Sequence, residues 1–213
     1  MSARDDVLSR IRTAIGERSA EPEAAFSYRE RGELAPAALL DLLADRLVDY
    51  RAHVRRATVA TLPAEVGSAL AARGARRVIV PSAIAVAFPD DVTVVVDEAG
   101  LSAADLDRFD GVITRAAVAI AETGTIILDS SQGQGRRAIS LVPDYHLCIV
   151  AASQVVHLVP EAVARLAGHQ TPPSAGRPLT WISGPSATSD IELERVEGVH
   201  GPRTLEVILV ADA

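Results

Sequence analysis

Residues 77–97 read RVIVPSAIAVAFPDDVTVVVD and hold two short apolar runs on either side of a proline-bearing segment. Both runs, Arg77–Pro81 and Val92–Asp97, are nearly continuous in apolar residues and do not alternate with polar ones. Strands that are buried on both faces, as in parallel sheets, have this composition. We therefore predict two buried strands here, in a sheet covered by helices.

The same kind of run recurs along the chain, with helical segments between the runs. Further strands are expected at 56–60, 112–114, 125–129, 146–151, 179–182 and 205–210, and helices at 63–73, 102–108 and 161–167. Gly74 should end the first of these helices, and Ser102 should cap the second. Alternating strands and helices predict an α/β fold with a mostly parallel, open sheet and flanking helices.

The N-terminal part has a different character. Apolar residues between Val7 and Ile15 recur at helical spacing up to Gly16, and a polar connector follows. A longer helix then starts at Pro36, with an apolar face of Leu39, Leu43, Leu47 and Tyr50. We predict a helical lead-in with its connector over residues 1–34 and a single domain over residues 35–213.

Composition excludes several functional classes. The net charge of −7 gives no electrostatic footprint for nucleic acid, and no apolar stretch reaches membrane-spanning length. The N-terminus has no apolar signal segment, so we expect a cytoplasmic protein without membrane insertion. The single cysteine, Cys148, excludes an internal disulfide and an iron–sulfur cluster held by this chain alone. Cys148 lies in an apolar run, which favours a core residue over a catalytic thiolate.

One candidate ligand site lies after the strand expected at 179–182. The segment Gly184–Glu192 carries three hydroxyl residues, and Gly198–Pro202 follows soon after it. A strand, a glycine turn and a capped helix would place free backbone N–H groups where an anion can bind. The alternative is an ordinary helix, capped by Ser189 with Glu192 and stopped by Gly198. The candidate anion-binding residues are Gly184, Ser186, Thr188, Ser189, Asp190 and His200.

A second candidate site is the segment Glu122-Thr123-Gly124-Thr125, between two apolar runs. A carboxylate here must reach solvent or find a partner. Ligands in open α/β folds bind at sheet ends, so this turn is a candidate for ligand binding, with Glu122 as a nucleophile or base. The alternative is a solvent-facing turn with no function beyond connection.

Taken together, Ala121–Leu128, Val142–His146, Gly184–Glu192 and Gly198–Pro202 resemble the LUD domain family. The resemblance covers about residue 35 to the C-terminus, and it is closest to the small, cysteine-poor subfamily of a three-protein lactate-utilisation system. It implies a fold similar to the NagB/RpiA/CoA-transferase-like group. It also implies a role in oxidising L-lactate to pyruvate alongside partner proteins that carry iron–sulfur clusters.

Two functions remain open at this point. The first is a subunit of the lactate-oxidising assembly, with no cofactor in this chain, that binds a small anionic ligand or the partner chains. The second is an independent enzyme of the transferase or isomerase type, acting on a small carboxylate, CoA or phosphate compound through Glu122.

The histidines give no preformed metal site. The chain has no H-x-x-x-H or C-x-x-C pair, so we expect no metal ligands. A site assembled from His146, His200 and Glu122 across the fold is the alternative. Titration near neutral pH is the more natural use of His200, if it is functional.

Overall fold

The computed structural model describes residues 3–16, 28–98, 100–169, 177–188, 196–198 and 200–212. Its first helix, α1 (Ala3–Ile15), buries none of its residues. Helix α2 (Pro36–Asp49) begins with proline in its first turn, as the sequence predicts, and buries Leu40, Leu43 and Leu47. Tyr50, expected on that apolar face, instead follows the helix as its exposed C-cap.

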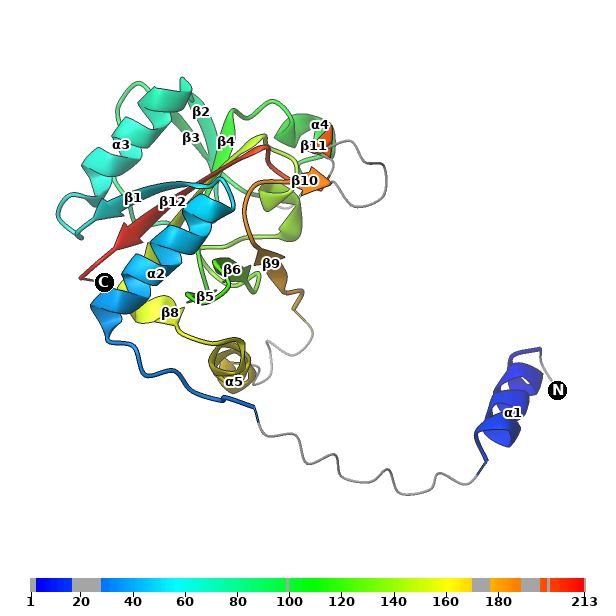
Figure 1. Cartoon of the computed structure of the whole chain (residues 1–213). Coiled ribbons are helices and arrows are strands. Elements are labelled where there is room, and N and C mark those ends of the chain that lie inside the picture. Colours follow the sequence, from blue (N-terminus) through cyan, green and yellow to red (C-terminus); the bar gives the residue numbers. More distant parts are fainter. Residues whose placement is uncertain are drawn as a thin grey trace.

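The main sheet has six strands, all parallel, in the order β1-β12-β7-β4-β2-β3 (Figure 1). Its strands have these bounds: β1 (His53–Ala57), β2 (Arg77–Val80), β3 (Thr93–Val96), β4 (Gly111–Arg115), β7 (Tyr145–Ala151) and β12 (Thr204–Val210). The runs expected at 77–81, 92–97, 112–114, 146–151 and 205–210 each form a strand, whereas the strand expected at 56–60 lies earlier, at His53–Ala57, and only 56–57 of that prediction are in it. The predicted α/β class and the predominance of parallel pairing are confirmed.

A second, smaller sheet was not expected. Its four strands are β8 (Val155–Val156), β5 (Val118–Ile120), β6 (Thr125–Leu128) and β9 (Thr180–Ile182), in that spatial order, and β6 is antiparallel to both neighbours. The prediction of a single open sheet is wrong in this respect. The runs at 125–129 and 179–182 are strands, but they pair with each other. A fully apolar run shows that a strand is buried without showing which sheet it joins.

Helices cover both faces of the main sheet. Helix α3 (Leu62–Arg73) packs against one face, in a core cluster that includes the strand residues Val78, Leu147 and Ile208. The other face packs against α2 and the small sheet, through residues such as Val150 and Val207. Helix α3 ends at Gly74, whose φ of +64° confirms the predicted left-handed stop.

The remaining elements are short and fill the edges of the fold. They are α4 (Ala103–Leu106), the 3₁₀ helices η1 (Arg137–Ser140) and η2 (Ala152–Gln154), α5 (Val159–His169), and the hairpin β10 (Ala187–Thr188) with β11 (Val196–Glu197). Ser102 caps α4 as predicted, because its hydroxyl accepts from the Asp105 N–H. In the part of the chain that the structure describes, no helix is long and apolar enough to cross a membrane.

Cys148 is a core residue, as the sequence predicts. Its side chain is fully buried on β7, in the cluster that joins the main sheet to α2 and the small sheet. Burial raises the pKa of the thiol to about 12. At neutral pH the group is therefore a protonated, unreactive thiol.

The α3 face also buries a carboxylate. Glu206 on β12 is 2% exposed, and its oxygens lie 2.5 Å from Arg55 Nε and 3.4 Å from Arg73 Nε. The Tyr145 hydroxyl donates to the same carboxylate at 3.0 Å. The hydrogen bond to Glu206 raises the pKa of Arg55 further above its usual value, while burial, together with the Glu206 charge, raises that of Tyr145. Glu206 is thus a buried charge with its partners in place.

We expect Glu206→Gln to lower the free energy of unfolding by about 3–5 kcal/mol, because it leaves the two guanidinium groups without a buried counter-charge. Urea unfolding followed by circular dichroism measures this. The matched control is Asp41→Asn, which removes an exposed pair with Arg56 and should cost less than about 1 kcal/mol. Equal losses in the two variants would contradict the buried-charge interpretation.

Candidate functional site

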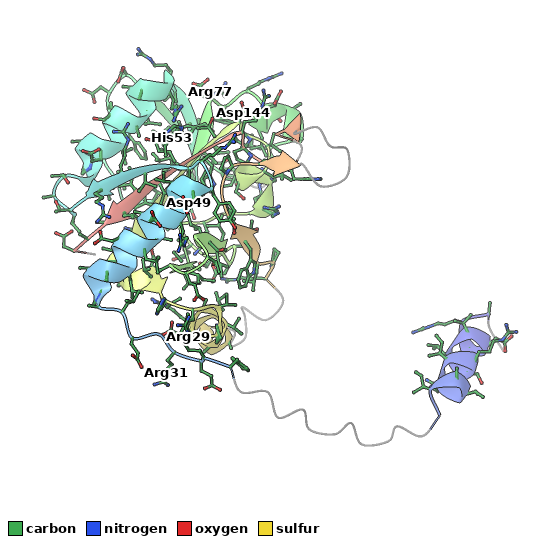
Figure 2. The ribbon with its side chains drawn as sticks, in the orientation of Figure 1. Arg29, Arg31, Asp49, His53, Arg77 and Asp144 are labelled. Carbon is green, nitrogen blue, oxygen red and sulfur yellow. The ribbon has the colours of Figure 1, made fainter. Side chains whose placement is uncertain are left out.

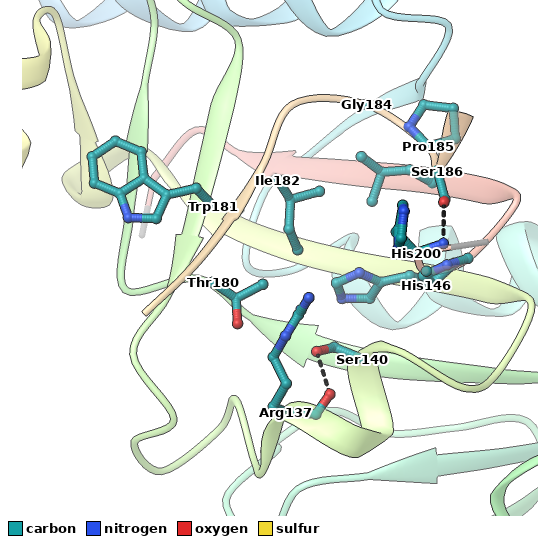
Figure 3. Close-up of a pocket in the computed structure, with 13 residues that line it drawn as sticks. Arg137, Ser140, His146, Thr180, Trp181, Ile182, Gly184, Pro185, Ser186 and His200 are labelled. Carbon is teal, nitrogen blue, oxygen red and sulfur yellow. Dashed lines mark hydrogen bonds between the residues drawn. The ribbon is translucent and has the colours of Figure 1, made fainter. Parts of the chain in front are cut away.

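A cavity of about 220 Å³ lies between η1, the amino end of β7, strand β9 and the loops that follow β9 and precede β12 (Figure 3). Its walls come from segments that are far apart in the sequence. Its polar lining residues are Arg137, Ser140, His146, Thr180, Ser186 and His200. None of the lining residues that the structure describes is acidic, so the cavity favours an anion.

His146 forms the floor of the cavity. It lies on β7, is 1% exposed, and shares a hydrogen bond of 2.7 Å between its Nε2 and Thr114 Oγ1 on the neighbouring strand β4. The Thr114 hydroxyl in turn lies 3.7 Å from Cys148 Sγ. Burial lowers the pKa of His146 to about 4, so the ring is neutral at physiological pH. His146 therefore offers a hydrogen bond, and the positive charge of the cavity must come from elsewhere.

Arg137 supplies that charge. Its side chain extends from η1 toward the His146 ring (Figure 3). Within the described part of the chain, no hydrogen bond or ion pair engages the Arg137 guanidinium. The preceding residue is different, because Arg136 forms a two-oxygen ion pair with Asp97 and donates to Leu101 O. Adjacent arginines thus have separate roles, one structural and one available to a ligand.

The loop after β9 is joined to the loop before β12. The Ser186 N–H donates to Pro202 O at 2.8 Å, and its hydroxyl accepts from the His200 N–H at 3.0 Å. Gly184 permits this path, since its φ is +93° and a Cβ there would lie 2.8 Å from Tyr50. Ser186 is therefore part of the scaffold, which the sequence analysis did not expect. Its hydroxyl proton is still available to a ligand.

The secondary structure after Gly184 differs from the prediction. Ala187–Thr188 forms a strand, and it pairs with Val196–Glu197. The prediction of a helix that ends at Gly198 is therefore wrong, because Val196 and Glu197 are extended and hydrogen-bonded to another strand. Ser189 and Asp190, with the expected helix start, lie outside the described residues.

The Glu122–Thr125 turn connects β5 to β6 and lies beside the cavity loop. Thr125 Oγ1 is 2.8 Å from both Thr123 Oγ1 and Ser183 Oγ, and Ser183 immediately precedes Gly184. Gly124 has a φ of +60°, and a Cβ there would lie 2.8 Å from Arg46 Cβ on α2. A glycine is required at this close approach of turn and helix.

Glu122 points away from the cavity. Its side chain is 46% exposed and pairs with Arg29 at 2.5 Å, on the connector that passes beside α5 (Figure 2). His146 and His200 line the cavity, whereas Glu122 does not. The assembled three-residue metal site is thus not formed. Across the described ranges, no group of three His, Cys, Asp or Glu residues is placed to hold a metal ion.

The sequence analysis missed Arg137 and Thr180 as cavity residues. Thr180 is buried on β9, and Arg137 comes from η1. Arg137 belongs to the short basic pair Arg136-Arg137, to which the sequence analysis gave no role. No local sequence pattern distinguishes Arg136 from Arg137. Arg136 pairs with Asp97, and Arg137 lines the cavity with strand β9, and both partners are distant in the chain.

Comparison with known proteins agrees with these motifs. The LUD domain family matches residues 37–210. The chain is 48% identical to Lactate utilization protein C of Deinococcus radiodurans, over 98% of this chain and 95% of the relative. It is 38% identical to the protein of the same name from Bacillus subtilis, over 47% of this chain and 42% of the relative.

A solved structure is also similar. It is a crystal structure of a DUF162 family protein from Deinococcus radiodurans, with a TM-score of 0.68 and 45% sequence identity. The match covers 84% of this chain and 99% of that one. The similarity therefore extends to the tertiary structure of most of the chain.

His146 should make stability depend on pH. Its pKa falls from 6.5 to about 4 on folding, so the native state is favoured by the neutral ring. This contribution is present above pH 6.5 and is lost as the pH falls toward 4, with a slope of up to about 1.4 kcal/mol per pH unit. We expect urea unfolding between pH 7 and 4.5 to show a shallower decline for His146→Gln than for the wild type. An unchanged slope in His146→Gln would count against a buried neutral ring.

Proposed function

The chain belongs to the LUD domain family, and on this premise we propose that it is a subunit of a lactate-utilisation system that binds a small anion in the Arg137 cavity. The system oxidises L-lactate to pyruvate, and the electrons pass to partner proteins with iron–sulfur clusters. The similarity to proteins named Lactate utilization protein C supports this assignment.

The observation that carries the proposal is the Arg137 guanidinium, which has no partner among the described residues and lies in a cavity whose described lining residues include no acid. A guanidinium presents two parallel N–H groups that match the two oxygens of a carboxylate. The hydroxyls of Thr180 and Ser186 add uncharged donors around the same space. The neutral His146 ring can accept or donate one hydrogen bond, according to its tautomer. This combination suits a small carboxylate such as lactate or pyruvate.

The redox step is assigned to the partners. The one thiol of this chain is buried and protonated, so we propose that the chain holds no cofactor and positions the anion. The alternative of an independent transferase or isomerase requires Glu122 to reach a substrate. Glu122 pairs with Arg29 and is absent from the cavity lining, which favours the binding role.

Arg137→Gln should weaken the binding of pyruvate by roughly 10- to 150-fold, the range expected for losing a charge-assisted hydrogen bond. Isothermal titration calorimetry on the full chain measures the effect. Arg31→Gln is the matched control, since Arg31 lies on the connector beside α5 (Figure 2) and outside the cavity lining. Similar affinities for wild type and Arg137→Gln would argue that the anion binds elsewhere.

The purified chain alone should not reduce a dye or NAD in the presence of L-lactate, because the proposal places the redox centres on the partners. Adding the iron–sulfur partner proteins should give lactate-dependent dye reduction that depends on this chain. Absorbance of the dye provides the measurement. Steady turnover by the isolated chain would overturn the subunit assignment.

A further inference from the structure

The parallel strands β4 and β7 bend out of the main sheet together. The pair continues as β5 and β8, which are also parallel, in the small sheet. A bend interrupts the ladder of backbone hydrogen bonds, so the freed groups need other partners. Gln154 provides them, because its Nε2 donates to Ala116 O at 2.5 Å and its Oε1 accepts from the Ala151 N–H at 2.9 Å.

The loop after β6 is fixed against the same bend. The Arg115 N–H donates to Gly133 O at 2.7 Å, which ties the loop to the end of β4. Inside the loop, the Ser131 N–H donates to Asp129 Oδ1 at 3.0 Å, and Gln134 accepts from the Asp129 N–H at 2.5 Å. The glycine-rich segment around Gly133, whose φ is +83°, is therefore hydrogen-bonded both within itself and to the end of β4.

A second cavity, of about 310 Å³, lies between this bend, the loop and α5. Its charged lining residues are Arg115, Asp129 and Arg165. Arg165 donates to Ser153 O at 2.7 Å. In the described part of the chain, nothing bonds to the Arg115 guanidinium, and nothing bonds to Asp129 Oδ2. Among the described residues, the cavity thus presents a cation and an acceptor atom without hydrogen-bond partners, and hydrogen bonds fix the backbone beside both residues.

We propose that this second cavity binds a small carboxylate that also carries a hydroxyl group. The Arg115 guanidinium holds the carboxylate of the ligand, and Asp129 Oδ2 accepts the hydrogen bond from its hydroxyl. This site shares no lining residue with the Arg137 cavity, and it does not depend on the proposed function. None of the candidate sites in the sequence includes its lining residues.

The charges of the cavity select this ligand class. Two arginines disfavour a cation, while the Asp129 carboxylate repels a group with two negative charges, such as a phosphate ester. A ligand without a hydrogen-bond donor would bury the Asp129 carboxylate without giving it a hydrogen bond, which is unfavourable. A monoanion with a neighbouring hydroxyl satisfies both Arg115 and Asp129.

Titration of the ¹⁵N-labelled full chain with glycolate, followed by NMR, tests the proposal. Glycolate should shift the backbone amide signals of Ala116, Ser131 and Gly133. Arg115→Gln should weaken that response by roughly tenfold or more, since it removes the charged donor. Arg137→Gln should lower the response at Ser186 and Gly201 without changing the response at the bend. Acetate, which lacks the hydroxyl, should bind at the bend roughly tenfold more weakly than glycolate.

Within the described residues the Arg115 guanidinium makes no hydrogen bond or ion pair, so Arg115→Gln should leave the fold intact, and the melting temperature of the variant checks this directly. Arg115→Lys is the second variant, and it should bind with intermediate affinity because it retains the charge without the planar fork. The proposal is overturned if glycolate shifts no signal at the bend, if Arg115→Gln responds like the wild type, or if acetate binds there as well as glycolate.

Discussion

The position of β7 at the centre of the main sheet is the constraint on which the rest of the structure depends. β7 pairs in parallel with β4 on one side and with β12 on the other, so that His146 lies opposite Val112 and Leu205. Successive residues of a strand face opposite sides of the sheet. A slip of one residue would turn His146 toward α3 and Tyr145 toward the small sheet, exchanging the surroundings of both.

The two faces of the sheet bury polar groups in different ways. On the α3 face, the buried Glu206 side chain forms ion pairs with two partly exposed arginines, Arg55 and Arg73. On the opposite face, His146 has only the uncharged Thr114 hydroxyl as a hydrogen-bond partner in the described residues, and burial keeps it neutral. The first arrangement stabilises the fold with a paired charge. The second leaves a neutral polar group at the floor of a cavity whose charge comes from Arg137.

Both cavities are linked to β7. The Arg137 cavity lies at its amino end, beside His146, and the Arg115 cavity lies beyond its carboxyl end, where Gln154 holds the bend. The small sheet contributes a wall to each, through β9 in the first and the loop after β6 in the second. The small sheet therefore does more than cover the core. It forms part of a polar cavity at each end of β7, and each cavity contains an arginine whose guanidinium has no partner among the described residues.

Local patterns in the sequence determined the elements of this protein. The apolar runs at 77–81 and 92–97, the stop at Gly74, the cap at Ser102 and the burial of Cys148 all follow from side-chain burial and backbone geometry within a few residues. The glycine- and hydroxyl-bearing segments 184–192 and 198–202 also led to Gly184, Ser186 and His200, which line a cavity. Tertiary structure alone decided that β6 and β9 pair in a second sheet, that Glu122 pairs with Arg29, and that Arg136 pairs with Asp97 whereas Arg137 lines a cavity. Each of these depends on contacts between segments distant in the chain, and an apolar run or a charged side chain has the same local sequence whichever distant partner it meets.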